Sequence, residues 1–120
     1  MKNCGKWIRE QYGKLRNWRE IAKQASKAIR EVIPCCEVYV FGSIVEGKVT
    51  GASDIDVLVV IGGEVDILQL RRLWISLNEK LEEILGENAY IIDLHLISRD
   101  MVEKPPYKQW LEKAKALNPS

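Results

Sequence analysis

Two long segments of the chain carry apolar residues at three- and four-residue steps with charged residues between them, the pattern of amphipathic helices. The first predicted helix covers residues 15–33 and ends before Pro34, which cannot continue a helix. The second covers residues 66–85, with an aspartate that can cap its start and Gly86 to close it. The apolar stripes are Leu15, Trp18, Ile21, Ala22, Ala25, Ile29, Val32 and Ile33 in the first helix and Leu70, Leu73, Trp74, Leu77, Leu81, Ile84 and Leu85 in the second.

Three shorter segments have the residue pattern of strands. Residues 36–41 are rich in valine and aromatic side chains, and residues 55–61 form an almost continuous run of branched apolar residues. The second pattern is typical of a central strand that is covered on both faces. In residues 90–97 the side chains alternate, so that Asp93 and His95 are expected on one face and the leucines on the other.

The alternation of helical and strand patterns predicts an α/β (α+β) fold, with a small mixed sheet of at least three strands covered by helices. No repeat or Pro/Ser-rich linker divides the sequence, so one domain is expected over residues 1–120, with its core at about 15–100. A shorter C-terminal helix is expected within residues 105–117, after two prolines, and could pack Trp110 against the core or a partner.

The charged residues are distributed unevenly, although the formal net charge is only +1. The first thirty residues hold nine Lys and Arg against two Glu, a local excess of seven positive charges. This basic segment could meet an acidic partner or RNA, but a run of charges is more often a solvated surface. The weak overall charge also disfavours a broad nucleic-acid footprint.

The three cysteines, Cys4, Cys35 and Cys36, form no C-x-x-C pair, so neither a disulfide framework nor a zinc site is predicted. The longest apolar stretch, residues 57–61, is too short to span a bilayer, and no apolar run follows the basic N-terminus. A cytoplasmic protein without membrane association is therefore expected.

Two aspartates stand at the start of the predicted central strand. Asp54 and Asp56 are two residues apart, so they project from the same face with Cα atoms about 6.5 to 7 Å apart. Buried like charges repel each other unless a cation compensates them, and magnesium suits both carboxylate and phosphate oxygens. A third acid on a neighbouring strand would complete such a metal site, and Asp93 is suitably placed.

A Gly-Ser pair at the end of the first predicted strand offers a small anion cradle. Gly42 lets the backbone approach a phosphate without a Cβ in the way, and Ser43 adds a hydroxyl and an amide at the start of a turn. Each short motif alone is common as a turn or a surface pair, so their combination is what indicates a nucleotide site.

These motifs together resemble the nucleotidyltransferase superfamily that includes DNA polymerase beta and kanamycin nucleotidyltransferase. The resemblance rests on Gly-Ser at 42–43, Asp-Ile-Asp at 54–56 after ten intervening residues, and Ile-Asp-Leu-His at 92–95. It covers roughly residues 15–100. The closest likeness is to the minimal nucleotidyltransferase (MNT) proteins of prokaryotes, stand-alone domains that are often encoded beside a helical HEPN protein.

The resemblance implies a role for each motif residue. Gly42 and Ser43 would hold the triphosphate, Asp54 and Asp56 would bind the metal ions, and Asp93 would bind one metal and help to activate the acceptor hydroxyl. The implied reaction is an in-line transfer of AMP from ATP with two magnesium ions, in which pyrophosphate departs.

The sequence also departs from the family pattern. Many relatives place arginines just after Gly-Ser, whereas Ile, Val and Glu occupy residues 44–46 here. Lys48 is then the nearby cation that could bind the nucleotide phosphates, and it could equally be a solvated loop residue. His95 shares the face of Asp93, but a lone histidine on a strand is more often structural, so the predicted catalytic set omits it.

The acceptor is expected on another macromolecule. Kanamycin-type enzymes hold a small-molecule acceptor with a further helical domain, and only about twenty residues follow the third predicted strand here. In the MNT/HEPN systems that the chain resembles, the nucleotidyltransferase is an antitoxin that adenylylates a tyrosine of the HEPN ribonuclease. A HEPN-family partner and that activity form the leading hypothesis, and a homodimer is a further expected assembly.

Three alternatives remain open at this point. The chain could be an antitoxin or adaptor that neutralises its partner by binding alone, although such a module has no need for buried like charges. It could transfer a nucleotide to an RNA end, or adenylylate a small molecule as a homodimer.

Overall fold

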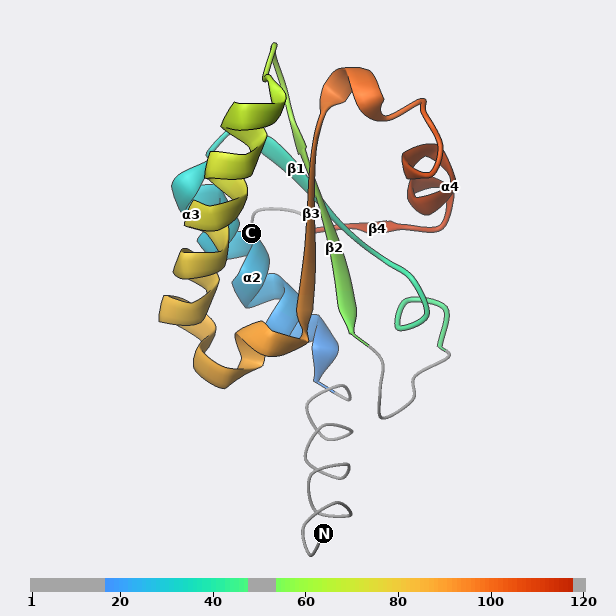
Figure 1. Ribbon diagram of the computed structural model, residues 1–120. Coiled ribbons are helices and arrows are strands. Elements are labelled where there is room, and N and C mark those ends of the chain that lie inside the picture. The colour runs from blue at the N-terminus through green and yellow to red at the C-terminus, as the bar shows by residue number, and fades with distance from the viewer. Residues whose placement is uncertain (1–16, 48–53, 118–120) are drawn as a thin grey trace, which may run out of the picture.

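In the computed structural model, residues 17–47 and 54–117 are described, and they are organised around a four-stranded sheet (Figure 1). The strand order is β3-β2-β1-β4. β2 pairs antiparallel with β1 and parallel with β3, and β4 pairs antiparallel with β1, so the sheet is mixed as predicted. The strands are β1 (Cys36–Phe41), β2 (Ile55–Ile61), β3 (Ile92–Ser98) and β4 (Lys115–Ala116).

Two long helices cover one face of the sheet. Figure 1 shows α2 (Trp18–Val32) and α3 (Ile67–Leu85) side by side there, which confirms the two predicted amphipathic helices. Asp66 caps α3 through a reciprocal pair of hydrogen bonds with Gln69, and Gly86 ends it. The largest fully buried side chains of this layer include Ile29, Ile55, Leu77, Leu81, Val38, Val40, Val57 and Val59.

The C-terminal segment covers the opposite face. There η2 (Arg99–Met101) and α4 (Tyr107–Glu112) pack over a second, smaller cluster. As a result Leu58 and Val60 of β2 are buried on this face of the sheet, while the residues that alternate with them are buried on the helix-covered face. This confirms the prediction of a central strand that is covered on both faces. The cluster comprises Phe41, Leu58, Val60 and Ile97, with Tyr39, Met101, Val102, Tyr107, Trp110, Leu111 and Ala114 packed against it.

The third strand starts later than the alternating pattern predicts. A 3-10 helix, η1 (Gly86–Ile91), precedes β3, and Tyr90 within it is 78% exposed. The chain leaves α3 at Gly86 and must turn before it can pair with β2, so the first two residues of the predicted 90–97 strand are used in that turn.

The predicted C-terminal helix over 107–117 is too long. The helix ends at Glu112, and the chain then pairs with the free edge of β1 as β4. The amide of Leu117 donates to the carbonyl of Val38 at 2.8 Å. Backbone hydrogen bonding along β1 therefore overrides the helical spacing of the apolar residues.

The predicted apolar stripe of α3 is wider than the face that the protein buries. Trp74 and Ile84 are 45% and 46% exposed, whereas Leu77, Leu81 and Leu85 are buried and Leu70 and Leu73 are partly buried. α3 lies over β3, the outermost strand, so residues at the margin of the stripe extend beyond the sheet. The indole Nε1 of Trp74 instead donates to the carbonyl of Leu94 at 3.0 Å.

Several sequence predictions lie outside the described residues: those on 1–16, including Cys4 and most of the basic segment, and that on Lys48. Cys35 is exposed and Cys36 is buried, and both are free thiols. Among the described helices, none is long and apolar enough to cross a membrane.

Candidate active site

The parallel pairing of β2 with β3 brings two of the predicted aspartates together. Asp56 lies opposite Asp93 in the register of the two strands. His95 follows Asp93 by two residues, and its Nε2 lies 3.3 Å from Asp93 Oδ2 and 3.9 Å from Asp56 Oδ1. One ligand atom from each of Asp56, Asp93 and His95 lies within 4.8 Å of the other two.

Gly42 shapes the same site from the other neighbouring strand. β1 pairs with β2 so that Phe41 lies opposite Asp56, and Gly42 follows directly with a φ of 89°. A Cβ at this position would collide with Oδ2 of Asp56 and lie 3.3 Å from its Cγ. Glycine is therefore needed here both for the backbone conformation and for the close approach to the carboxylate.

A tight turn follows Gly42. Its carbonyl accepts hydrogen bonds from the amides of Val45 at 3.2 Å and Glu46 at 3.4 Å, and Ser43 is half-buried at the start of this turn. The predicted Gly-Ser turn is thus present beside Asp56. Its use as a phosphate cradle is a prediction.

Asp54 lies directly before β2, on an exposed position. Partial burial, and then the charges of Asp93 and Asp56, raise the pKa of its carboxyl. The three predicted aspartates therefore share one negative field, which a bound cation would relieve. Asp54 is not among the three residues whose ligand atoms come within 4.8 Å, so a direct contact between Asp54 and a metal stays a prediction.

His95 belongs to this site although the predicted catalytic set omits it. The carboxylate of Asp56 is the largest cause that raises the pKa of His95, against the lowering effect of burial and with a further contribution from Asp93. The imidazole also contacts Trp110 and Phe41, at ring-centroid distances of 4.9 and 5.6 Å. The available signal was the two-residue spacing from Asp93, which places both side chains on one face of β3.

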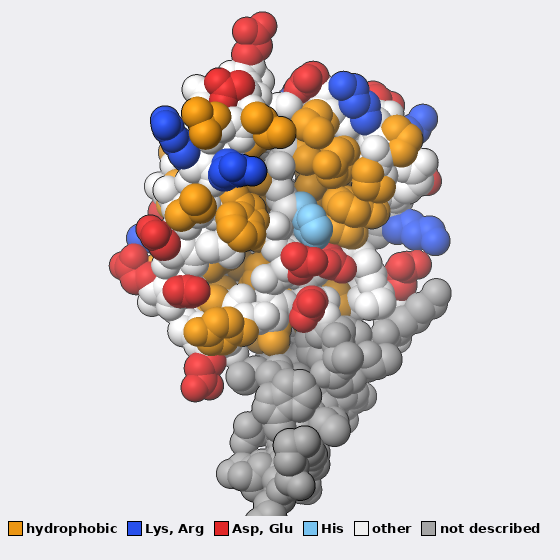
Figure 2. All heavy atoms as spheres, in the orientation of Figure 1, with side chains coloured by type: hydrophobic (Ala, Val, Ile, Leu, Met, Phe, Trp, Pro, Cys, Tyr) orange, Lys and Arg blue, Asp and Glu red, His pale blue; other side chains and the backbone are white. Residues whose placement is uncertain are grey.

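An aromatic wall stands beside the acidic group. Trp110 of α4 stacks on Phe41 at 4.6 Å, and Tyr107 contacts Trp110 edge to face at 5.3 Å. Figure 2 shows the histidine between acidic side chains and an apolar surface. Trp110 thus closes one side of the site, whereas its expected role was only to pack against the core or a partner.

The acidic group opens into a cavity of about 400 Å³. Lys113, just after α4, lines it and lies 3.4 Å from Glu46, with Nζ and Oε1 as the nearest atoms. This lysine supplies a cation that the sequence pattern did not point to, because it is 67 residues away from Glu46 along the chain. The lining residues are Phe41, Gly42, Glu46, Asp56, Asp93, His95, Gln109, Trp110 and Lys113.

The residues present fit a hard divalent cation. Asp56 and Asp93 offer oxygen ligands from neighbouring strands, and the added negative charge of Asp54 favours a cation at this edge. Imidazole nitrogen is not a preferred ligand for magnesium, so the position of His95 beside Asp93 fits better with orienting the carboxylate.

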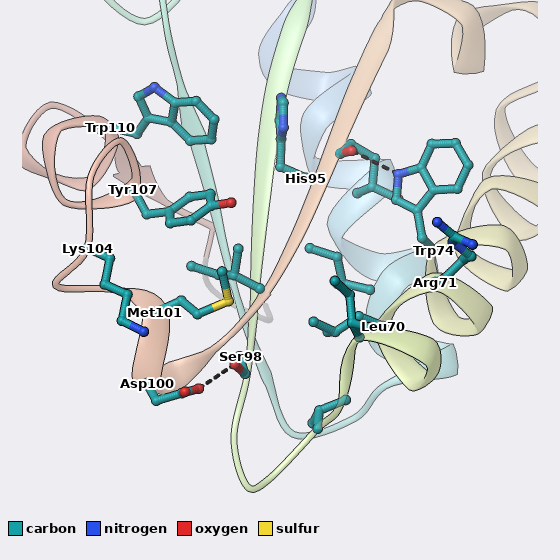
Figure 3. Close-up of a pocket in the computed structure, with 15 residues that line it drawn as sticks. Leu70, Arg71, Trp74, His95, Ser98, Asp100, Met101, Lys104, Tyr107 and Trp110 are labelled. Atoms are coloured by element: carbon teal, nitrogen blue, oxygen red, sulfur yellow. Dashed lines mark hydrogen bonds between the residues drawn. The ribbon is translucent and has the colours of Figure 1, made fainter.

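A second, larger groove adjoins this cavity. It measures about 630 Å³ and runs between α3 and the C-terminal segment, across β3. Figure 3 shows Trp74, Arg71 and Leu70 on one side and Trp110, Tyr107, Met101 and Lys104 on the other, with His95 between them. His95 and Trp110 line both spaces, so the groove leads to the acidic group.

Comparison with known proteins shows the family and agrees with the fold. A family model described as "Nucleotidyltransferase domain" matches residues 19–118. The fold is similar to the crystal structure of a Sulfolobus solfataricus protein that was provisionally assigned as a nucleotidyltransferase. That match has a TM-score of 0.56 and 20% sequence identity, and covers 92% of this chain and 84% of the other. No match was found among proteins of curated function.

Proposed function

Because this chain belongs to the nucleotidyltransferase domain family, we propose that it transfers AMP from ATP to a hydroxyl of a partner protein. The proposed acceptor is a tyrosine of a HEPN-type helical partner, which makes the chain an MNT antitoxin. The observation that carries the nucleotidyl transfer is the meeting of Asp56 with Asp93 across β2 and β3, beside the turn at Gly42. The choice of acceptor rests on the family resemblance and on the groove between α3 and the C-terminal segment.

In this proposal Asp56 and Asp93 hold magnesium, and Asp54 adds a third carboxylate to the same field. Bound magnesium supplies Lewis-acid chemistry, lowering the charge on the phosphate oxygens and on the departing pyrophosphate. His95 keeps the carboxylate of Asp93 in place from 3.3 Å. In this proposal the reacting phosphate lies on the open side of Asp56 and Asp93.

In the proposed transfer step one bond forms, one bond breaks and one proton moves. The acceptor oxygen attacks the α-phosphorus, the new P–O bond forms, and the bond to the β-phosphate breaks so that pyrophosphate leaves. Asp93 takes the proton of the acceptor hydroxyl, since its carboxylate is half exposed and faces the cavity. Ser43 and the backbone at Gly42 hold the triphosphate, and Lys113 offsets its charge together with Lys48.

The groove supports an acceptor that belongs to a larger molecule. Its walls are mainly apolar and aromatic, and it reaches from the site along β3 to Ser98, farther than a small hydroxyl compound needs. Arg71 and Lys104 also line it, and within the described part of the chain neither forms an ion pair. A partner segment with apolar side chains and an acidic flank would fit this lining.

The test is to incubate the protein with ATP, magnesium and the helical protein encoded beside it, and to measure the mass of that partner. Addition of AMP is expected with the wild type and with Glu64→Gln, a substitution of an exposed acid outside the site. Asp56→Asn and Asp93→Asn should abolish it. Normal ATP binding without any AMP on the partner would refute the protein acceptor, and small hydroxyl compounds and RNA ends would then be the acceptors to examine.

A binding-only antitoxin is the second candidate. Its support is the exposed apolar surface on α3, where Ile67 is 85% and Leu68 52% exposed. The same aspartate variants separate the two candidates. If the Asp56→Asn variant neutralises the partner as well as the wild type does, binding alone is favoured. If the variant loses both AMP transfer and neutralisation, the enzyme is favoured.

A further inference from the structure

The outer face of α3 carries a stripe of residues that nothing in the described structure covers. Leu68, Arg72, Ile75, Glu79 and Glu82 recur at three- and four-residue steps, on the side of the helix opposite the buried leucines. Leu68 and Ile75 are 52% and 48% exposed. These five residues are referred to below as the α3 stripe.

The charges along this face are separated by sign. Arg71 and Arg72 lie in the N-terminal half of α3, and Glu79, Glu82 and Glu83 lie in the C-terminal half. In Figure 2, on the α3 side of the molecule, basic side chains lie in the upper part and most acidic side chains lie lower, with apolar side chains among both. The arginines lie toward the positive N-terminal end of the helix dipole and the glutamates toward its negative C-terminal end, so the dipole does not stabilise these charges.

None of these charges is neutralised within the protomer as far as the described residues extend. The ion pairs there involve Lys80 with Glu31, Arg99 with Glu37, Lys113 with Glu46, and His95 with its two aspartates. The five charged residues on the outer face of α3 therefore remain available to a partner of complementary charge.

We propose that a second copy of this chain docks on the α3 stripe, with the two α3 helices antiparallel about a twofold axis at Ile75. This orientation places Arg71 of one copy opposite Glu79 of the other, and brings Arg72 within reach of Glu79 and Glu82. The Ile75 side chains meet at the centre. A parallel orientation would place like charges opposite each other, so the charge order of the helix selects the antiparallel dimer.

The dimer should be weak and sensitive to salt. The contact uses one helix from each copy, so its buried area is smaller than the roughly 1,200 Å² that stable interfaces bury. Its charged pairs lie at the edge of the contact, where salt screens them. It leaves the acidic cavity open, because that cavity is lined from the α4 side and by no residue of α3. Arg71 is the residue of the contact that also lines the larger groove.

Complementary charge reversal tests this arrangement. Sedimentation velocity at low salt should show a concentration-dependent dimer for the wild type, and monomers for Arg71→Glu/Arg72→Glu alone and for Glu79→Arg/Glu82→Arg alone. An equimolar mixture of these two variants should recover a dimer, because each basic face then meets an acidic one. The control Lys23→Glu/Lys27→Glu changes the net charge as the arginine pair does, but on the exposed side of α2, and should dimerise like the wild type.

A cross-link tests the position of the axis. In a background with serine at the exposed Cys35 and at Cys4, Ile75→Cys should form a covalent dimer on oxidation, whereas Ser76→Cys, also exposed on α3, should not. A wild type that stays monomeric at every concentration would overturn the proposal. So would a variant mixture that remains monomeric while circular dichroism shows both variants folded.

Discussion

Replacing Gly42 with alanine would separate two roles of this residue, its backbone conformation and its closeness to Asp56. The φ of 89° is a region that side-chain-bearing residues rarely adopt, and the added Cβ would collide with Oδ2 of Asp56. Gly63 provides a matched control. Its φ is 86°, but nothing lies within 4 Å of a Cβ placed there.

The expected effects on stability can be worked from these two environments. Each substitution should lower the free energy of unfolding by about 1–2 kcal/mol, because an L-residue is strained at positive φ. For a chain of this size, that corresponds to a fall in melting temperature of roughly 4–8 °C. Gly42→Ala should lose more than Gly63→Ala, since the Asp56 carboxylate or the turn must also move.

The decisive difference should be in metal and nucleotide binding. A shift of the Asp56 carboxylate separates it from Asp93, so Gly42→Ala should lose magnesium-dependent ATP binding. Gly63→Ala should bind like the wild type, because its strain lies at the far end of β2. Titration calorimetry at a temperature where urea unfolding shows both variants folded would measure this difference.

Two results would refute this account. If Gly42→Ala binds magnesium and ATP as tightly as Gly63→Ala, the position of the Asp56 carboxylate does not depend on the missing Cβ. If both variants lose binding together, backbone strain rather than the collision is responsible.

Substitutions at three further positions test other parts of the structure. Leu81→Ala, at a side chain that is 1% exposed, should lower the unfolding free energy by about 2–5 kcal/mol in urea denaturation. Trp110→Ala should reduce both stability and ATP affinity, whereas Trp110→Phe, which keeps an aromatic ring against the wall, should retain most of both. Hydrogen bonds from Tyr39, and to a smaller extent from Arg99, lower the pKa of Glu37 below its usual value of 4.5. These hydrogen bonds therefore stabilise the fold above pH 4.5, and the stabilisation is lost as the pH falls through the lowered pKa. Glu37→Gln should therefore cost less than about 1 kcal/mol at pH 7 and nothing in stronger acid, as unfolding at both pH values would show.

Much of the fold could be predicted from local patterns. The apolar spacing of α2 and α3, the capping aspartate at residue 66 and the almost continuous apolar run of β2 each depend on residues close together in the sequence. Boundaries were less predictable where two interactions compete. Residues 115–116 could continue a helix, but the open edge of β1 offers hydrogen bonds that no local pattern reveals.

The candidate site was predictable only in part. The Gly-Ser pair and the first two aspartates are recognisable as a motif, because they belong to one turn and one strand start. That Asp93 faces Asp56 depends on the parallel register of β2 with β3, which is set by packing along both strands. Whether a histidine two residues later is structural or part of the site depends on the same register.

The sequence by itself therefore determined the two long helices, the first three strands and the acids that these strands carry, since these follow from the period of the backbone and from residue chemistry. Only the tertiary structure decided which groups meet. Lys113 and Trp110 reach the cavity because the chain after β3 folds back over the sheet, and the groove beside them lies between that segment and α3, across β3. Such contacts join residues far apart in sequence, and the packing that brings them together is a property of the whole fold.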